Sequence, residues 1–227
     1  MFPGHFGVAF AAKRATPRTS LGTLVFAATF LDLLWPILLL LGVERVQIVP
    51  GHLPANPLIF EYYPYSHSLA AAIVWSLLIG GVYYAISRKR GAAWVVGALV
   101  LSHWILDLPM HEADLALWPG SSIKVGFGLW RSLPWSILVD VGVFVLGLAI
   151  YLRGTRSRDR VGVWALWAFV AVVLLIFVGG FAGPPPANQR ALGLSALLLW
   201  LFPPWCAWFD RHRGTRRVLS TAESPTR

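Results

Sequence analysis

The chain has 227 residues, of which 57% are hydrophobic and only 13% are charged. Soluble domains usually carry about 25% charged residues, so this composition excludes an ordinary soluble protein and indicates an integral membrane protein. The formal net charge of +9 comes from Lys and Arg clusters between apolar runs, which argues against nucleic acid as a partner and for membrane lipid. The twelve Trp residues fit aromatic belts at the membrane interfaces, and the single cysteine, Cys206, excludes an internal disulfide.

Apolar runs predict six membrane spans, because a spanning helix needs about 20 predominantly apolar residues. These runs lie at 21–43, 66–87, 92–108, 132–152, 161–180 and 191–208. Residues 2–12 are apolar but too short to span, so they predict an interfacial or half-inserted helix. A signal peptide is the alternative, but the following run has no clear small-residue cleavage site, which favours a retained helix. The fold class is therefore an all-α polytopic membrane bundle, with one integral membrane domain at 1–210 and a basic tail at 211–227.

Basic residues alternate between successive connecting segments. Fifteen of the 19 Lys and Arg residues lie in the N-terminal segment, the second and fourth loops and the tail. The positive-inside rule then predicts that both termini are cytoplasmic. Two outer loops, 44–65 and 109–131, are long and rich in aromatic residues, and we expect them to form ordered covers over the outer face.

Ionisable residues inside spans are expensive to bury and are functional candidates by default. The central stretch, Leu101–His111, places His103, Asp107 and His111 at every fourth position of an apolar run. On a helix His103 and Asp107 share one face, whereas His111 joins them only if Pro109 kinks the last turn. Imidazole and carboxylate are common ligands of zinc, manganese and iron. The competing interpretation is a structural His–Asp pair.

The candidates' depths follow from a rise of about 1.5 Å per residue, counted from each basic cluster. His5 comes out about 12 Å deep, and Asp32 and His103 about 16 Å deep. Asp107 comes out about 22 Å deep, so these four side chains could converge in one pocket. His67 lies nearer the outer surface and joins them only if its helix is tilted or begins below the membrane surface.

Each candidate also has a structural interpretation. His5 could be an interfacial histidine, Asp32 a hydrogen-bonding residue near a proline kink, and His67 a helix cap at the water interface. Asp140, in the fourth predicted span, is expected to pair with Arg131 or a neighbouring Trp rather than to bind a metal. Two histidines and two carboxylates at similar depth in hydrocarbon nevertheless need mutual partners or a cation. A divalent metal would satisfy them together.

The motifs also occur in a characteristic order. They are Gly4-His5, Leu31-Asp32-Leu33, Tyr65-Ser66-His67-Ser68-Leu69, Leu101-Ser102-His103-Trp104-Ile105-Leu106-Asp107 and Leu117-Trp118-Pro119. Over residues 1–125 this order resembles the YdjM-like family of membrane-bound metal-dependent hydrolases, distant relatives of the zinc-dependent phospholipase C-like proteins. The resemblance implies a metal-dependent hydrolase, and we expect it in the bacterial inner membrane.

The sequence departs from the family pattern at two of these motifs. The family's Pro-Asp-x-Asp is reduced to Leu31-Asp32-Leu33-Leu34, so one carboxylate is missing. The family's His-Arg-Gly-x-Thr-His-Ser is replaced by residues 61–68, which lack one His and the Arg. Fewer ligands argue against a two-metal site, unless His111 and Glu112 compensate.

The expected function is metal-dependent hydrolysis of a lipid-like or amphiphilic ester or phosphoester. The expected ligands of the divalent metal, zinc first and manganese or iron as alternatives, are His5, Asp32, His67, His103 and Asp107. Either carboxylate could instead orient a ligating imidazole. Glu112 or His111 would be the general acid at the pocket mouth, and Arg131 and Lys124 would hold a phosphate or carboxylate of the substrate.

Two alternatives stay open at this point. The first is a non-enzymatic membrane protein with a structural, metal-translocating or proton-translocating His/Asp site. The second is a degenerate cluster that only packs the bundle. The sequence does not specify the substrate or the oligomeric state.

Overall fold

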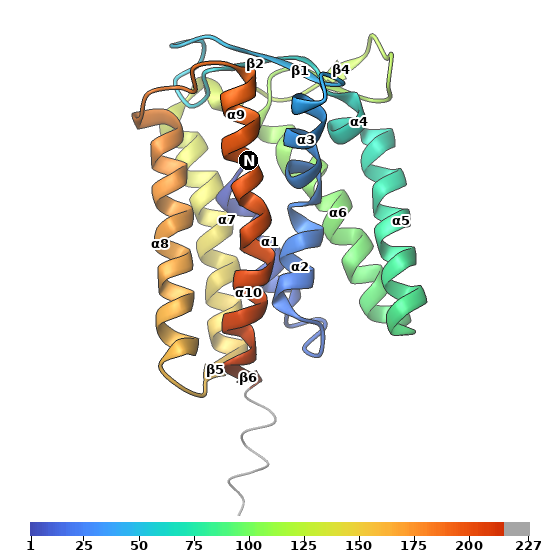
Figure 1. The fold of residues 1–227 in the computed structure, drawn as a ribbon, viewed down its shortest axis with the longest axis vertical. Coiled ribbons are helices and arrows are strands. Elements are labelled where there is room, and N and C mark those ends of the chain that lie inside the picture. Colours follow the sequence, from blue (N-terminus) through green and yellow to red (C-terminus); the bar gives the residue numbers. More distant parts are fainter. Residues whose placement is uncertain (216–227) are drawn as a thin grey trace, which may run out of the picture.

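The computed structural model describes residues 1–215 and consists mainly of helices that run along one common direction (Figure 1). The helices, in chain order, are α1 (Pro3–Ala12), α2 (Leu21–Ala28), α3 (Phe30–Leu40), α4 (Pro64–His67), α5 (Leu69–Ser87), α6 (Arg90–Met110), α7 (Leu133–Gly154), α8 (Val161–Ala182), α9 (Gln189–Ala196) and α10 (Phe202–Arg211). The 3₁₀ turn η1 (Leu129–Arg131) precedes α7, and η2 (Leu197–Leu201) joins α9 to α10.

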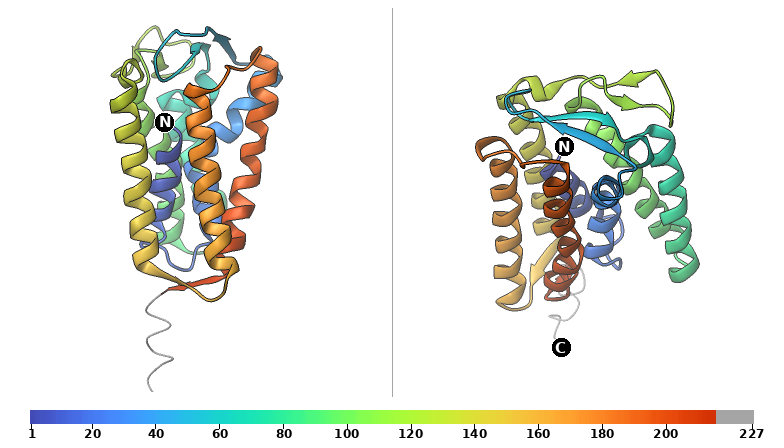
Figure 2. Two further views of the ribbon diagram at one scale, coloured as in Figure 1. Left: turned by 90° about the vertical axis from the view of Figure 1, so that its left-hand side faces the viewer. Right: turned by 45° about the horizontal axis from the view of Figure 1, so that its top comes forward.

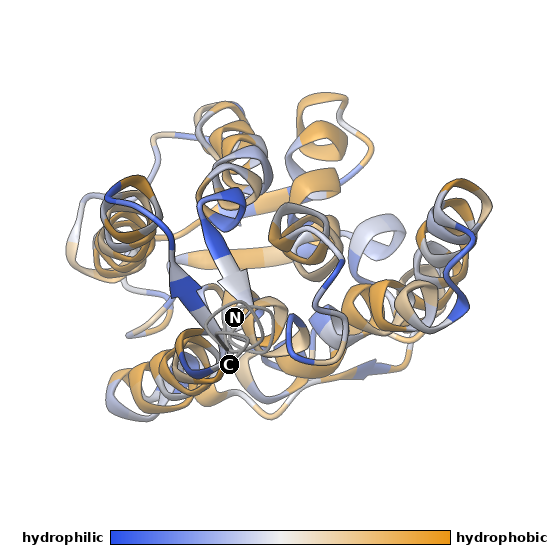
Figure 3. Ribbon diagram, turned by 90° about the horizontal axis from the view of Figure 1, so that it is seen from below, coloured by the Kyte–Doolittle hydropathy of each residue, from blue (hydrophilic) through white to orange (hydrophobic). Residues whose placement is uncertain are grey.

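Within residues 1–215, five helices are long and apolar enough to cross a membrane: α5, α6, α7, α8 and the continuous helix Gln189–Arg211. The pair α2 and α3 makes a sixth span if it is counted as one, although its two halves meet at a bend of 55°. This confirms the all-α polytopic bundle, with five or six helices able to span a membrane where about six were predicted. Seen along the bundle axis, the helices are coloured mainly as hydrophobic and the hydrophilic colour gathers in the connecting segments (Figure 3).

Short antiparallel hairpins close both ends of the bundle. The paired strands are β1 (Arg45–Ile48) with β2 (Leu58–Tyr62), β3 (Leu115–Ala116) with β4 (Lys124–Val125), and β5 (Thr155–Ser157) with β6 (Arg213–Thr215). The first two pairs lie over one end and β5–β6 lies at the other (Figures 1 and 2). The two long loops are thus ordered covers, held together by aromatic contacts such as Phe60 stacked on Trp130.

The connection between α7 and α8 is fastened to the end of α10. Arg158 donates its backbone N–H to the carbonyl of His212, and His212 Nδ1 lies 2.6 Å from Asp159 Oδ2. The hydrogen bond from His212 lowers the pKa of the Asp159 carboxyl. Of the predicted tail at 211–227, residues 216–227 lie outside the described residues.

The half-helix α1 lies inside the bundle, and the chain starts about midway along it (Figure 1). Most of its residues are buried. Lys13 Nζ lies 2.6 Å from Asp210 Oδ2, so the loop after α1 and the end of α10 share the end that carries β5 and β6. The basic segment therefore reaches that end of the bundle while Met1 does not. Which side of the membrane this end faces stays a prediction from the charge pattern.

The bend between α2 and α3 has a local cause. The hydroxyl of Thr29 donates to the carbonyl of Val25, 2.8 Å away, which also accepts the Thr29 N–H, and such added side-chain bonds often bend helices. Ala28, the last residue of α2, presents its carbonyl to the bundle interior, where it accepts a hydrogen bond from His103. The bend thus supplies an acceptor inside the bundle that a straight span would not provide.

Candidate metal centre

The structure brings the five predicted ligands together from four helices. They are His5 of α1, Asp32 of α3, His67 of α4, and His103 and Asp107 of α6. The three imidazoles and Asp107 are buried, and Asp32 is partly exposed to the adjoining cavity. His67 reaches the others because α4 is a separate turn that packs against α3, and α5 begins only after it.

The two carboxylates lie between the three imidazoles. His103 Nε2 is 3.3 Å from Asp107 Oδ2 and 3.6 Å from Asp32 Oδ1. His67 Nε2 is 3.5 Å from Asp32 Oδ1 and 3.9 Å from Asp107 Oδ2. His5 Nε2 is 3.2 Å from Asp107 Oδ1. Two ligands of one tetrahedral zinc lie about 3.4 Å apart when their bonds are about 2.0–2.2 Å long. The separations therefore fit a shared ion within each of two triads, His5–His103–Asp107 and Asp32–His67–His103.

The tautomer of His103 provides a second test of that fit. Its Nδ1 lies 2.8 Å from the carbonyl of Ala28, which can only accept, so Nδ1 carries a proton. Nε2 then faces two carboxylates, where it can bind a metal or carry a second proton. Within residues 1–215, His103 Nε2 and both ring nitrogens of His5 are buried without a hydrogen-bond partner. Buried acceptors that face one another need a cation or a proton between them.

A buried relay orients His67 in the same way. Its Nδ1 lies 2.7 Å from Ser66 Oγ, and Ser66 in turn donates to Glu44 Oε2 at 2.6 Å. The other oxygen of Glu44 accepts the backbone N–H groups of Tyr65 and Ser66, both at 2.8 Å. Because the Ser66 hydroxyl proton is used by Glu44, its oxygen accepts from His67, which leaves His67 Nε2 free to face the carboxylates.

Glu44 and Ser66 are functional candidates that the sequence analysis missed. Glu44 is fully buried, although it directly follows a predicted span and opens a long loop. The sequence offered only one signal for this contact, a carboxylate at the start of a loop that is followed by a Ser-His pair. Their contact depends on how the loop folds back, and sequence spacing does not give that.

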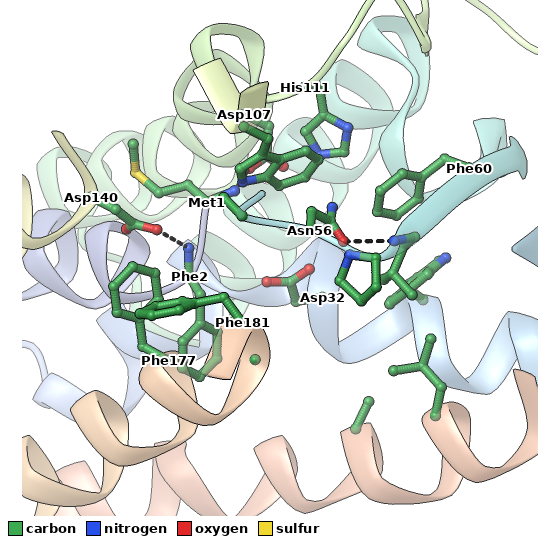
Figure 4. Close-up of a pocket in the computed structure, with 18 of the residues that line it drawn as sticks. Met1, Phe2, Asp32, Asn56, Phe60, Asp107, His111, Asp140, Phe177 and Phe181 are labelled. Atoms are coloured by element: carbon green, nitrogen blue, oxygen red, sulfur yellow. Dashed lines mark hydrogen bonds and ion pairs between the residues drawn. The ribbon is translucent and has the colours of Figure 1, made fainter. Parts of the chain in front are cut away.

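Asp140 of α7 holds the start of α1. It accepts the backbone N–H of Phe2 at 2.9 Å and that of Gly4 at 2.7 Å (Figure 4). The predicted pairing of Asp140 with Arg131 or a Trp is therefore wrong. The physical reason is that α1 presents unpaired N–H groups at its N-terminus, which an acidic side chain satisfies. This anchor sets His5 against His103, with the two rings stacked at 3.7 Å between centroids.

The Met1 nitrogen also contacts the cluster. It lies 2.5 Å from Asp107 Oδ1, beside His5. The Asp107 carboxylate thus lies close to the Met1 nitrogen and to the imidazoles of His5, His67 and His103.

The two candidate general acids lie in different surroundings. His111 borders the same cavity as Asp107, and its Nδ1 lies 3.0 Å from Asp114 Oδ1. Burial lowers the pKa of His111, and the hydrogen bond with Asp114 opposes that shift. Tyr63 also donates to Asp114, at 2.7 Å, and burial raises the pKa of this tyrosine well above its usual value. His111 is therefore oriented by its neighbours at the cavity wall.

Glu112 is held outside the cavity. Arg131 donates to Glu112 Oε1 through Nε at 2.8 Å, and its NH2 nitrogen lies 2.7 Å from the same oxygen. His52 approaches the other Glu112 oxygen at 3.6 Å. Arg131 is 72% exposed, and Lys124 lies in the exposed strand β4, so the structure does not bring these two residues to the cluster.

A cavity of about 300 Å³ opens directly onto the cluster (Figure 4). Its polar side is formed by Asp32, His67, Asp107, His111 and Asp140. Its remaining walls are mainly apolar and come from the loop before β2, from α8 and from the α9–η2 segment. A small amphiphilic molecule could therefore place its polar group against the cluster and its apolar part against the opposite wall.

Comparison with known proteins identifies a family. A family model described as YdjM inner membrane protein matches residues 63–184. The matched segment contains His67, His103 and Asp107, follows His5 and Asp32 in the chain, and extends beyond residue 125 into α7 and α8. Neither the curated proteins nor the solved structures provide a match. Because the matched segment covers more than half of the chain's 227 residues, the chain belongs to the YdjM inner membrane protein family.

Proposed function

We propose that this protein is a membrane-embedded, metal-dependent hydrolase of a lipid-like or amphiphilic ester or phosphoester. The observation that carries the proposal is a pair of triads that share His103, namely His5–His103–Asp107 and Asp32–His67–His103, in which buried ring nitrogens face carboxylate oxygens. Ionisable groups inside a membrane bundle need mutual partners or a cation. A divalent cation would satisfy all five side chains.

The donor set favours zinc, with manganese or iron as alternatives, because all five ligands offer nitrogen or oxygen. The residues that would hold the ion are His5, Asp32, His67, His103 and Asp107. A divalent metal bound there would supply a Lewis acid that brings the pKa of a bound water toward neutrality.

The protein's own residues would supply orientation and proton transfer. Ser66 and Glu44 fix the ring of His67, and Asp140 fixes the helix that carries His5. His111, held by Asp114 at the cavity wall, would donate a proton to the leaving group. His111 takes this role in preference to Glu112, since Glu112 is paired with Arg131.

One-sided access favours a hydrolase over a translocating site. The cavity adjoins the cluster on the side of the β1–β2 hairpin. On the opposite side the interior is filled by Phe6, Phe10 and Leu24, each at most 1% exposed. A carrier needs a path to both faces, whereas a hydrolase needs a pocket with one opening.

Turnover by the reconstituted protein tests the proposal. The full chain in phosphatidylcholine vesicles is presented with a panel of ester and phosphodiester amphiphiles, before and after chelation and zinc addition. We expect turnover that chelation abolishes and zinc restores, a loss of at least about 100-fold in His103→Ala, and no loss in His212→Ala, whose imidazole lies at the other end of the bundle. Turnover that is insensitive to chelation would contradict the proposal. Metal flux across the vesicles without turnover would support the translocating alternative.

A further inference from the structure

The cavity at the cluster is lined on one side by residues of α8 and α9, several of which are drawn in Figure 4. The residues of this wall include Ile176, Phe177, Gly180, Leu192, Ala196 and Leu199. Ile176 and Gly180 are exposed on the bundle surface and also border the cavity, so they lie at its margin. The end of the bundle is covered instead, since the loop before β2 and Trp130 complete the lining there.

The two helices that flank this opening are packed differently. All the buried residues of α8 lie between Gly162 and Val173, and within the described chain none of residues 174–182 is buried. The second half of α8 thus stands away from the core. The start of α9 is fixed elsewhere: Gln189 accepts the N–H of Val46 and donates to the carbonyl of Leu39, both at 3.0 Å.

The connection between the two helices keeps them apart. Residues 183–188 include three consecutive prolines, Pro184, Pro185 and Pro186. Proline fixes φ near about −65°, and successive prolines form a semi-rigid extended spacer. The separation of α8 and α9 at the opening therefore depends on this proline-rich connection as well as on side-chain packing.

We propose that a single-chain amphiphile enters the cavity sideways from the membrane, between the second half of α8 and α9. Its acyl chain lies against Gly180, Leu192 and Ala196, and its polar head reaches the cluster of Asp32 and Asp107. The volume of about 300 Å³ is at the lower end of the range for ligand pockets, which suits one chain rather than two. Hydrolysis of the head rests on the proposed function, whereas the route and the seat of the chain do not.

Two adjacent glycines provide a matched test of this route. A Cβ added at Gly179 or at Gly180 meets no described atom within 4 Å, so neither position is crowded. Gly180 borders the cavity and Gly179 is not among its lining residues, because neighbouring positions of a helix point about 100° apart. Gly180→Trp should therefore fill the opening, and Gly179→Trp should place the same side chain toward lipid.

The probe is a lysophosphatidylcholine with a photoreactive diazirine in its acyl chain, added to the full chain in phosphatidylcholine vesicles. We expect labelling of residues 174–199 in the wild type and in Gly179→Trp, and about tenfold less labelling in Gly180→Trp, equivalent to about 1.4 kcal/mol of binding. Equal labelling of the two variants, or wild-type labelling confined to other helices, would overturn the proposal.

A second pair of variants tests the same route independently, in case Gly180→Trp or Gly179→Trp fails to fold. Ala196→Phe narrows the opening from α9, and Leu198→Phe changes an exposed residue of η2. Ala196→Phe should lower the labelling and Leu198→Phe should not, and the reverse result would contradict the route. Labelling needs no turnover, so Gly180-dependent labelling without any hydrolysis would leave this inference standing and overturn the proposed function.

Discussion

His103 and His67 direct the same ring nitrogen toward the carboxylates because each gives its other ring N–H to a fixed acceptor. For His103 the acceptor is the carbonyl of Ala28, and for His67 it is the hydroxyl of Ser66. Partners of this kind fix the tautomer and ring orientation of metal-binding histidines. The relay from Glu44 through Ser66 therefore belongs to the site, although it contacts no carboxylate of the cluster.

Ser66→Ala tests this relay. The change leaves His67 Nδ1 without its acceptor and Glu44 without its side-chain donor, so we expect metal affinity to fall about 10–100-fold. The free energy of unfolding should fall by about 1–3 kcal/mol, because buried polar groups lose their partner. Competition with a chromogenic chelator measures the affinity, and thermal unfolding in detergent measures the stability.

Ser68→Ala is the matched control. Ser68 lies two residues away and accepts the N–H of Ala71 as the N-cap of α5, so its loss should cost about 1 kcal/mol of stability. It should leave metal affinity unchanged. Equal affinities for the two variants would show that the relay plays no part in holding His67.

Spacing along one helix could be predicted from sequence, and contacts between loops could not. His103 and Asp107 are four apart in an apolar run, so their common face follows from helix geometry. The motif placed His67 in the site, whereas the depth estimate placed it nearer the outer surface. The sequence does not show that His67 lies in a separate turn before α5. Glu44 contacts Ser66 only because the loop between them folds back, and the hydrophobic periodicity of the sequence does not predict that fold.

At the scale of elements, α1 packs closely against α7 through two glycines. A Cβ at Gly147 would overlap the backbone carbonyl of Gly7, and a Cβ at Gly7 would meet the backbone of Val143 and Phe144. This close approach places α1, and with it His5, at the depth of the cluster. The sequence indicated a half-inserted helix but not the helix it packs against.

Gly147→Ala should therefore push α1 away from α7. Overpacking of this kind costs about 1–3 kcal/mol of stability, and the shift of His5 should lower metal affinity by at least about tenfold. Gly142→Ala, on the same helix, has no described atom within 4 Å of the added Cβ, so it should leave metal affinity unchanged and should not lower the stability. Thermal unfolding and chelator competition on both variants check this, and an unaltered Gly147→Ala protein would contradict the packing account.

The bend between α2 and α3 marks another limit of prediction at this scale. Residues 21–43 form one apolar run, which indicates a single span. Pro36 signals a kink, but the chain bends at Thr29, where the side-chain hydroxyl adds a second hydrogen bond to the carbonyl of Val25 that already accepts the Thr29 N–H. That bend determines where Ala28 meets His103, so part of the site depends on it.

At the scale of the whole molecule, six apolar runs and their order could be predicted because hydrocarbon requires long, internally bonded helices. The arrangement of these helices around a central half-helix could not, since it depends on close contacts such as Gly7 with Gly147. The cluster joins four elements, α1, α3, α4 and α6, so a bound ion would tie together segments distant in the chain.

Chelation should therefore lower the stability of the entire bundle. A ligand present at 100 times its dissociation constant stabilises the folded state by about 2.7 kcal/mol, and at this chain length that corresponds to about 5–10 °C in Tm. We expect a chelator to lower Tm by that amount in the wild type and to leave Asp107→Asn unchanged. An equal drop in both proteins would point to a metal bound elsewhere or to an effect of the chelator alone.

Elemental analysis of the purified protein in detergent tests the central claim most directly. It compares the wild type with His103→Ala and Asp107→Asn, and uses His212→Ala as the control for loss of an imidazole outside the cluster. The account predicts a stoichiometric divalent metal, zinc first, in the wild type and in His212→Ala, and its loss in the other two variants. A wild type that binds no metal, and is equally stable with and without chelator, would contradict it.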